Sequence, residues 1–348
     1  MQTEAAVLVE LNEPLQPMTL ELPELKPGQA LVEVAYSGVC HSQLNEIRGR
    51  RGPDRYLPHT LGHEGAGVVQ AVGPGVAKVK PGDRVVLTWI KGEGADVPSC
   101  GYRCADGATT INSGPLSTFM RHTVTCENRL VPLPPDMPLR EAALLGCAVP
   151  TGAGIVINSA AVRRGASVAV FGAGGIGLSA LLAARMLESR PLIAVDVVER
   201  KLAEARRLGA THTVNAGQCD PVAVIRELTG GRGVDYAIEA AGRRETMETA
   251  FRSVRDQGGL CVLAGNLPHG ERISLDPFDL IRGKRIAGAW GGETRPDRDI
   301  PRYVEWFQQQ GFPLAELISQ EYSLGEINAA LDDLEQGRVV RALINMAA

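Results

Sequence analysis

Three side chains that zinc favours as ligands stand in separate segments of the chain. Cys40 lies in GVCHSQ, His63 in LGHEGAGVV and Cys147 in LLGCAVPTGAG. Two thiolates and one imidazole suit zinc, and three protein ligands leave the fourth tetrahedral position open to water or substrate. An open zinc site is a catalytic one, so these segments predict an enzyme. Taken singly, a cysteine is more often a small buried hydrophobic residue, and a histidine more often a surface or core residue.

A glycine-rich segment after Cys147 has the spacing of a dinucleotide-binding turn. An apolar run over residues 166–171 leads into Gly172, Gly174 and Gly177, and apolar residues at helical spacing follow. Such a turn lets the backbone approach a pyrophosphate and directs the N–H groups of a helix start at it. A second apolar run ends at Asp196, 19 residues after Gly177. A carboxylate there accepts hydrogen bonds from ribose hydroxyls and repels a 2′-phosphate, so we expect NAD rather than NADP.

The elements that must position these residues change character near residue 150. The first 148 residues contain short β-like runs separated by Pro and Gly, which favours a barrel or sandwich. From Thr151 strands and helices alternate, which predicts a doubly wound parallel sheet. Its six strands are expected at 166–171, 192–196, 211–214, 234–239, 259–264 and 285–289. A helix over 300–310 and a strand over 339–345 are expected to rejoin the first part.

Bulk properties exclude some classes of protein. The 348 residues suggest two domains, and 44% hydrophobic with 22% charged residues is typical of a globular protein. A net charge of −4 gives no reason to expect a nucleic acid partner. The start has no signal-peptide pattern, and no run reaches the roughly 18 apolar residues that span a membrane. Seven scattered cysteines without an export signal indicate a reducing cytoplasm.

One combination of motifs resembles a known family. GHE-x-x-G-x-V, PGDRVV and G-C-x-V-x-T-G, placed ahead of the glycine-rich turn, are similar to those of zinc-dependent medium-chain alcohol dehydrogenases. The resemblance covers nearly the whole chain. It implies an α/β protein with a β-rich, GroES-like catalytic domain (1–148 and 290–348) interrupted by a Rossmann NAD-binding domain (149–289). It also implies one catalytic zinc, hydride transfer between an alcohol or carbonyl substrate and NAD, and a homodimer or homotetramer.

The resemblance assigns roles to single residues. Ser42 would hydrogen-bond the bound alcohol, although it could be a polar turn residue, and Glu64 would lie behind the metal or be structural. Cofactor contacts are implied for His41, Thr151, Gly172, Gly174, Gly175, Ile176, Gly177, Asp196, Lys201 and Arg341. Lys201 could instead be a plain surface lysine. Leu44, Trp89 and Phe119 are expected on the substrate wall, with core packing as the alternative.

The chain departs from the family pattern at three places. Gln43 replaces an acidic residue that orients the zinc-bound histidine, and Asn45 replaces a histidine that ends the proton relay. The segment 91–114 has only Cys100 and Cys104 where relatives carry four cysteines for a structural zinc. Asp96 and Asp106 could complete such a site, but carboxylates are a less usual choice, so we expect an ordinary loop with two free thiols.

The sequence leaves the substrate open. The altered 91–114 segment and the few aromatic wall residues favour a polyol, sugar or secondary-metabolite alcohol over an ethanol-type substrate. Redox-neutral dismutation or epimerisation with tightly held NAD is an alternative. A non-catalytic relative that keeps the fold is another.

Overall fold

The computed structural model describes residues 1–104, 107 and 109–348. The chain divides into two compact units. The first unit is formed by Met1–Cys147 with Arg295–Ala348, and the second by Ala148–Thr294.

The first unit is built on two sheets. Within the described residues, one sheet has the order β4-β1-β2-β7-β8 and the other β10-β6-β5-β3-β18-β17, with β9 also on β3. The strands are β1 (Gln2–Leu8), β2 (Gln16–Glu21), β3 (Gln29–Gly38), β4 (His59–Thr60), β5 (Glu64–Val72), β6 (Arg84–Thr88), β7 (Tyr102–Cys104), β8 (Thr110–Ile111), β9 (His122–Cys126), β10 (Leu130–Pro132), β17 (Gln320–Ser323) and β18 (Ala342–Asn345).

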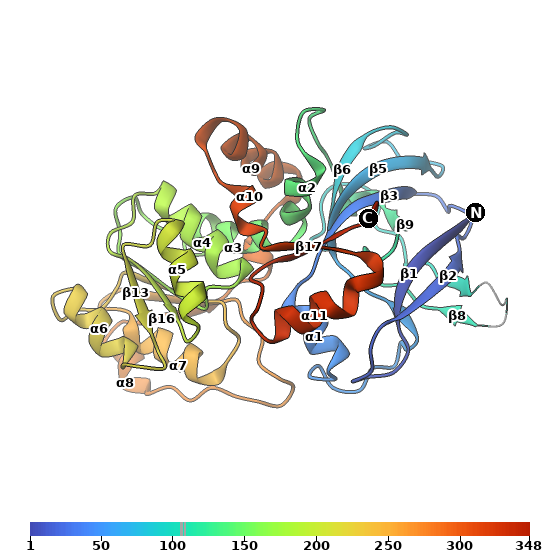
Figure 1. Cartoon of the computed structure of the whole chain (residues 1–348). Coiled ribbons are helices and arrows are strands. Elements are labelled where there is room, and N and C mark those ends of the chain that lie inside the picture. The colour runs from blue at the N-terminus through green and yellow to red at the C-terminus, as the bar shows by residue number, and fades with distance from the viewer. Residues whose placement is uncertain (105–106, 108) are drawn as a thin grey trace. The chain divides into compact units, whose positions relative to one another are not determined.

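The chain's C-terminal segment returns to the sheet that its N-terminal part begins. Strand β18 pairs antiparallel with β3, and the red and blue ribbons lie together in Figure 1. The unit's helices are α1 (His41–Ile47), α2 (Leu139–Ala142), α9 (Pro296–Gln310), α10 (Leu314–Leu317) and α11 (Ile327–Glu335), with short turns η1 (Glu127–Arg129), η2 (Ala143–Gly146) and η5 (Leu324–Glu326). This return confirms the expected last strand and the helix near residue 300.

The second unit is a doubly wound α/β layer structure. Its six described strands are all parallel, in the order β13-β12-β11-β14-β15-β16. They are β11 (Val168–Phe171), β12 (Leu192–Asp196), β13 (His212–Asn215), β14 (Tyr236–Glu239), β15 (Leu260–Leu263) and β16 (Arg285–Gly288). All six strands expected from the sequence are present. The reversal of strand order at β11 places the ligand crevice of such sheets at the carboxyl ends of β11 and β14.

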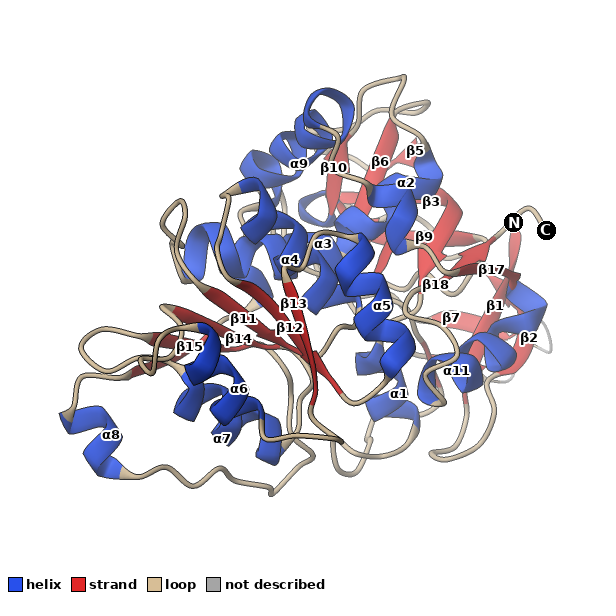
Figure 2. Ribbon diagram, turned by 60° about the vertical axis from the view of Figure 1, so that its left-hand side comes forward, coloured by secondary structure: helices blue, strands red, loops and turns tan. Residues whose placement is uncertain are grey.

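Helices cover both faces of this sheet. Figure 2 shows α4 on one side and α6 and α7 on the other. The helical segments are α3 (Ala148–Gly154), its π-helical continuation η3 (Ile155–Ser159), α4 (Gly175–Met186), α5 (Glu199–Arg207), α6 (Pro221–Leu228), α7 (Arg244–Ser253), α8 (Pro277–Ile281) and η4 (Gly291–Glu293). Both faces are therefore buried, which explains why β11 and β12 read as continuous apolar runs.

The expectation of an ordinary loop over residues 91–114 was wrong. Strand β7 pairs with β2 and β8, and the Tyr102 ring is fully buried among the residues of that sheet. The Tyr102 hydroxyl accepts a hydrogen bond from Val124 N–H at 2.9 Å. Burial of this ring fixes the segment as part of the first sheet.

In the part of the chain that the structure describes, no single helix is long and apolar enough to cross a membrane, although the bent pair Leu139–Gly146 and Ala148–Ser159 could by length and composition.

Candidate active site

The three predicted zinc ligands converge in the first unit. Cys40 precedes α1, His63 precedes β5 and Cys147 follows η2. The ligand atoms of Cys40, His63, Glu64 and Cys147 all lie within 4.8 Å of one another. His63 Nε2 lies 3.2 Å from Cys147 Sγ. Donor atoms at this separation can share one tetrahedral ion, so the cluster fits zinc.

Two glycines allow this convergence. Gly62 has a φ of +93°, and a Cβ there would lie 2.7 Å from the Phe119 nitrogen. A Cβ on Gly146 would lie 2.4 Å from the Leu87 carbonyl oxygen, which is less than any real Cβ contact. The residue before each of these two ligands must therefore be glycine for His63 and Cys147 to reach the cluster.

The protonation of the buried thiols also fits a cation. A hydrogen bond from the Cys147 thiol holds the pKa of Cys40 well below its usual value in spite of burial. The same pairing raises the pKa of Cys147 well above its usual value. Metal binding requires deprotonated thiols, so a dication held between these sulfurs would let both serve as thiolates.

Glu64 and Arg341 form a buried ion pair beside the cluster. Arg341 Nη2 meets Glu64 Oε1, and Arg341 Nη1 donates to the Val39 carbonyl at 3.2 Å. Both side chains are almost completely buried. Burial raises the pKa of Glu64, and the charge of Arg341 opposes that rise. Arg341, for which the sequence predicted a cofactor contact, is thus held in the first unit by Glu64.

Residues of α1 surround the imidazole. Gln43 Oε1 accepts from Cys40 N–H at 3.2 Å, and Gln43 Nε2 contacts His63 Nδ1. Ser42 Oγ lies 3.5 Å from the same nitrogen. Asn45 Oδ1 accepts from Arg50 Nη1 at 3.4 Å, so its amide oxygen is already engaged.

The three residues expected on the substrate wall have different surroundings. The Trp89 ring is partly buried and lies edge to face with His63, with centroids 6.4 Å apart. Leu44 and Phe119 are almost entirely buried in the hydrophobic core of the first unit. The structure therefore gives Leu44 and Phe119 packing roles and leaves Trp89 beside the candidate metal site.

The predicted cofactor turn joins β11 to α4 in the second unit. Gly172 has a φ of +92°, and a Cβ on Gly177 would lie 1.8 Å from the Gly172 carbonyl oxygen. Helix α4 can therefore begin this close to the strand only with glycine at 177. Gly174, Gly175 and Ile176 are partly exposed at the helix start, where free N–H groups can meet phosphate.

Asp196 is held rigidly at the end of β12. Its Oδ2 accepts from Ala173 N–H at 2.8 Å, and its Oδ1 accepts from Val197 and Val198 N–H at 2.8 and 3.0 Å. These bonds tie the carboxylate to the glycine-rich turn. Its remaining lone pairs suit ribose hydroxyls.

The other expected cofactor residues are spread over both units. Lys201 lies partly buried in α5 and Thr151 buried in α3, whereas His41 is exposed at the start of α1. Thr151 and Lys201 belong to the second unit, and His41 and Arg341 to the first.

One residue near the turn escaped the sequence analysis. Glu239 ends β14, is fully buried, and accepts from Ala241 N–H, Gly242 N–H and the Thr246 hydroxyl at 2.8–2.9 Å. A Cβ on Gly172 would meet Ala241, so Glu239 holds the loop against which the cofactor turn packs. The sequence VDYAIE, a strand-like run that ends in the carboxylate of Glu239, could have indicated this residue.

The segment 91–114 shows no cluster of metal-ligating side chains among its described residues. Cys100 is buried in the core around Tyr102, and Cys104 lies on β7; neither forms a disulfide bond. Asp96 pairs with Lys91. Asp106, the other carboxylate considered for this lobe, lies outside the described residues.

Known proteins with the same organisation are similar over almost the full chain. Residues 26–135 match the family described as alcohol dehydrogenase GroES-like domain, and residues 175–309 match the zinc-binding dehydrogenase family. The alcohol dehydrogenase class-3 of Cereibacter sphaeroides is 32% identical, covering 99% of this chain and all of that protein. The S-(hydroxymethyl)glutathione dehydrogenase of Paracoccus denitrificans is also 32% identical over 99% and 100% of the two chains.

Solved structures agree with these similarities. The crystal structure of an alcohol dehydrogenase zinc-binding domain protein from Burkholderia ambifaria has a TM-score of 0.92 and 34% identity, over 99% of both chains. Benzyl alcohol dehydrogenase from Acinetobacter calcoaceticus has a TM-score of 0.90 and 31% identity, over 99% of both. The chain therefore belongs to the zinc-dependent medium-chain alcohol dehydrogenase family, whose members use zinc and NAD to oxidise alcohols.

Proposed function

We propose that Cys40, His63 and Cys147 hold the catalytic zinc of an NAD-dependent alcohol dehydrogenase. The convergence of their three donor atoms carries this proposal. We propose that Glu64 lies behind the metal, on the side of the protein interior, since Arg341 neutralises its carboxylate. Zinc bound there supplies a Lewis acid that lowers the pKa of the substrate hydroxyl.

Ser42 is the residue to which we assign the first proton transfer. Its hydroxyl is half-buried beside His63 and can accept the proton of the alcohol at Oγ. Asn45 cannot carry that proton onward, because an amide does not ionise near neutral pH. We therefore propose that the proton leaves Ser42 directly to solvent. Ser42→Ala should lower kcat with little change in NAD affinity, whereas an unchanged kcat would refute this role.

We also propose that the two units have different binding roles. The first unit carries the metal and substrate side chains. The second binds NAD through the glycine-rich turn and Asp196. NAD binding that survives Cys147→Ala but fails in Gly177→Ala would support this assignment, and the reverse pattern would contradict it.

For the substrate, we propose an alcohol with an aromatic or apolar body. The Trp89 ring beside His63 offers an apolar surface to such a body and no charge to pair with several hydroxyls. Similarity to a benzyl alcohol dehydrogenase agrees with this class. We thus favour it over the polyol or sugar suggested by the sequence.

A panel of alcohols tests both reaction and substrate. Benzyl alcohol, ethanol and sorbitol are each incubated with NAD, and NADH absorbance is followed. We expect benzyl alcohol to have the highest kcat/KM, and Trp89→Ala to lower it by about tenfold or more. Turnover without net NADH would instead indicate a redox-neutral reaction, and preference for sorbitol would refute the aromatic substrate.

We propose that the protein is a homodimer joined at the edge strand β16. Three of its four residues are exposed, and its described pairing is with β15. The preceding helix α8 exposes Phe278, Leu280 and Ile281. An uncovered strand edge beside apolar side chains favours association. Light scattering after gel filtration should give a dimer that Leu280→Asp with Ile281→Asp converts to monomer.

We propose a cytoplasmic location, since all seven cysteines are free thiols in the structure. Fractionation of the source cells, with the activity measured in each fraction, tests this location.

A further inference from the structure

A second recess lies in the second unit, away from the cofactor turn. It has a volume of about 720 Å³ and is half-open. Its lining comes from the segments that lead into β14, β15 and β16. The recess therefore lies at the amino ends of these strands. Gly172 and Asp196 lie at the carboxyl end of β11 and β12. Because all these strands are parallel, this recess and the cofactor turn occupy opposite edges of the sheet.

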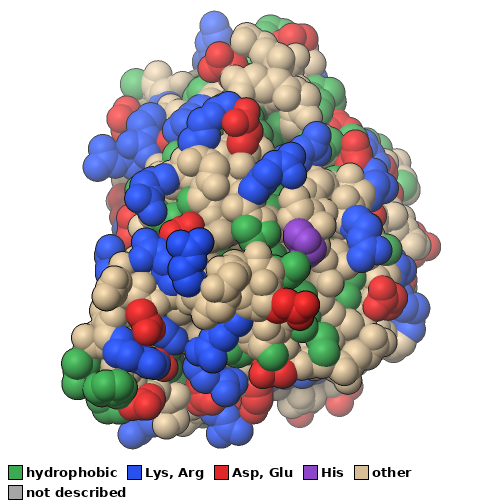
Figure 3. Space-filling view, turned by 90° about the vertical axis from the view of Figure 1, so that its left-hand side faces the viewer, with side chains coloured by type: hydrophobic (Ala, Val, Ile, Leu, Met, Phe, Trp, Pro, Cys, Tyr) green, Lys and Arg blue, Asp and Glu red, His purple; other side chains and the backbone are tan. Residues whose placement is uncertain are grey.

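Basic side chains dominate the recess, which we call the basic pocket. They are Arg226, Arg232, Arg255, Arg282 and Lys284. The face of the molecule in Figure 3 likewise carries many lysine and arginine side chains. The only apolar side chain of the lining is Val254, and none of the lining residues is aromatic. A ligand of this pocket must therefore be polar and anionic rather than hydrophobic.

Three of the five cations are neutralised by the protein. Arg255 Nε contacts Asp235 Oδ1 at 2.7 Å, Lys284 Nζ contacts Asp279 Oδ1 at 3.2 Å, and Arg282 Nε lies 3.7 Å from Asp256 Oδ2. Asp235 is further engaged by the backbone and hydroxyl of Ser167. These carboxylates are thus occupied within the fold.

Arg226 and Arg232 have no such partner. Among the described residues, no carboxylate lies within ion-pair distance of either guanidinium, and Arg232 Nε lies 3.5 Å from the Thr229 carbonyl oxygen. Both side chains are exposed, so their guanidinium donors are open to a ligand. A bound anion with at least two negative charges would occupy these donors.

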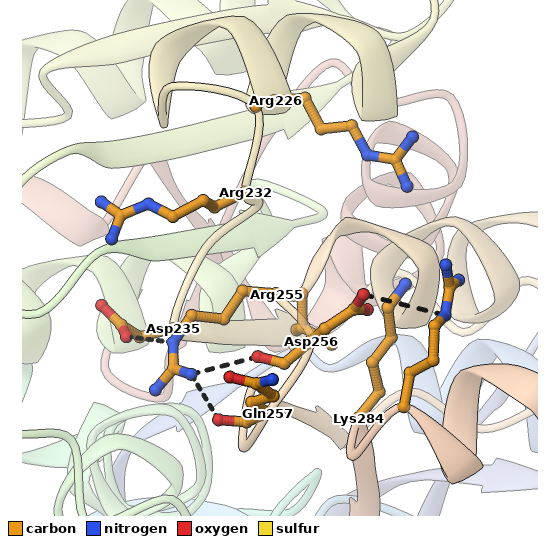
Figure 4. A pocket seen from close by; sticks show the side chains of 10 residues that line it. Arg226, Arg232, Asp235, Arg255, Asp256, Gln257 and Lys284 are labelled. Carbon is orange, nitrogen blue, oxygen red and sulfur yellow. Dashed lines mark hydrogen bonds and ion pairs between the residues drawn. The ribbon is translucent and has the colours of Figure 1, made fainter.

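The two uncompensated arginines point to opposite sides of the basic pocket. In Figure 4 Arg226 extends toward the side of Lys284, and Arg232 toward the side where Arg255 meets Asp235. An anion that meets both must therefore reach across the pocket. The pocket volume falls within the range of small-molecule sites, so an elongated anion fits it. Gly231, with a φ of +84° and an open Cβ position, lets the loop present Arg232 at the rim.

We propose that the basic pocket binds the polyphosphate chain of a small metabolite, with Arg226 and Arg232 holding its two ends. The chain could belong to a nucleoside triphosphate or to inorganic polyphosphate, since both present the same row of anionic oxygens. This site is independent of the zinc cluster and of NAD.

Calorimetric titration of the NADH-saturated, zinc-loaded enzyme tests this site. Saturating NADH blocks phosphate binding at the glycine-rich turn. Inorganic tripolyphosphate, ATP and orthophosphate are titrated separately at one ionic strength set with chloride. We expect one site per chain for tripolyphosphate and binding at least about tenfold weaker for orthophosphate. Tighter binding of ATP than of tripolyphosphate would identify a nucleotide as the source, and the opposite order would identify polyphosphate.

Paired variants separate the basic pocket from general electrostatic attraction. Arg226→Gln with Arg232→Gln should weaken tripolyphosphate binding by about tenfold or more. Arg190→Gln removes an exposed charge from the same unit outside the pocket and should leave binding unchanged. Zinc content is measured after each titration because polyphosphates chelate metals. Absence of binding to the wild type, or equal binding by the double variant, would overturn the proposal.

Discussion

At the candidate metal site, the Gln43 side-chain atom that faces His63 Nδ1 determines how well the imidazole is supported as a zinc ligand. Its amide has one acceptor end, used by Cys40 N–H, and one donor end, which contacts His63 Nδ1. If His63 Nε2 binds zinc, Nδ1 of the neutral ring carries a proton and needs an acceptor. In either orientation of the Gln43 amide, its NH2 group faces a hydrogen-bond donor, which is either Cys40 N–H or the protonated His63 Nδ1. A carboxylate would accept from both.

Gln43→Glu should therefore strengthen zinc binding. The substitution keeps the length of the side chain and replaces a donor by an acceptor, and such outer partners are worth about tenfold or more in metal affinity. Competition with a chelator measures the affinity. Asn45→Asp places the same charge on the same helix without contacting His63 and serves as the control. An equal gain in both variants would show that charge alone is responsible.

Asp196 should give a preference for NAD over NADP. Three backbone N–H groups hold its carboxylate in place, so it cannot move away from a 2′-phosphate. We expect kcat/KM to favour NAD by about tenfold or more, which corresponds to about 1.4 kcal/mol. Asp196→Ser should narrow this gap, with circular dichroism confirming the fold. Equal use of both cofactors by the wild type would contradict the assignment.

At the scale of elements, one buried carboxylate joins three segments of the first unit. Glu127 Oε2 accepts from Ala77 and Lys78 N–H at 3.0 and 3.1 Å, and its Oε1 accepts from Ala95 N–H at 2.8 Å. Burial would raise the pKa of Glu127, but these three backbone donors lower it overall. Glu127 directly follows strand β9, and it thus anchors the start of the 91–114 segment to that strand.

Glu127→Gln should destabilise the protein by about 2 kcal/mol at neutral pH, because charge-assisted hydrogen bonds become neutral ones. Since the folded pKa lies below the unfolded one, this contribution is present above the unfolded pKa and is lost as pH falls through the folded pKa. Urea unfolding at several pH values should therefore show the two proteins converging below about pH 4. Glu13→Gln, at an exposed position, is the control. A constant gap would exclude the carboxylate's charge as the cause.

Some elements carried strong local signals and others did not. The inner parallel strands β11, β12, β14 and β15 were found because both faces are buried and their sequences are largely apolar. The edge strands β13 and β16 were found from the alternation of strands and helices. Strand β2 and the short β7 and β8 were missed because they alternate polar and apolar residues over too few positions. Helix α11 was also missed, although Ile327, Leu331 and Leu334 recur at helical spacing and are buried.

For the whole molecule, we predict one zinc ion per chain. The described residues place Cys100 in an apolar core and bring no further donors to it or to Cys104. Elemental analysis of dialysed protein should return about one zinc, since a closed structural site needs four donors. The content should fall to near zero in Cys147→Ala and stay unchanged in Cys100→Ser. Two zinc ions, with one lost in Cys100→Ser, would refute this prediction.

The sequence by itself determined the chemical groups and the local turns that carry them. Cys40, His63 and Cys147 could be recognised from their segments, and Gly172, Gly177 and Asp196 from their spacing, because a tight turn and a strand end are short-range features. Only the tertiary structure decided which atoms meet across long separations. It paired Arg341 with Glu64, placed Leu44 and Phe119 in the core, and gathered Arg226 and Arg232 into one recess. Such contacts depend on packing between segments that no local pattern specifies.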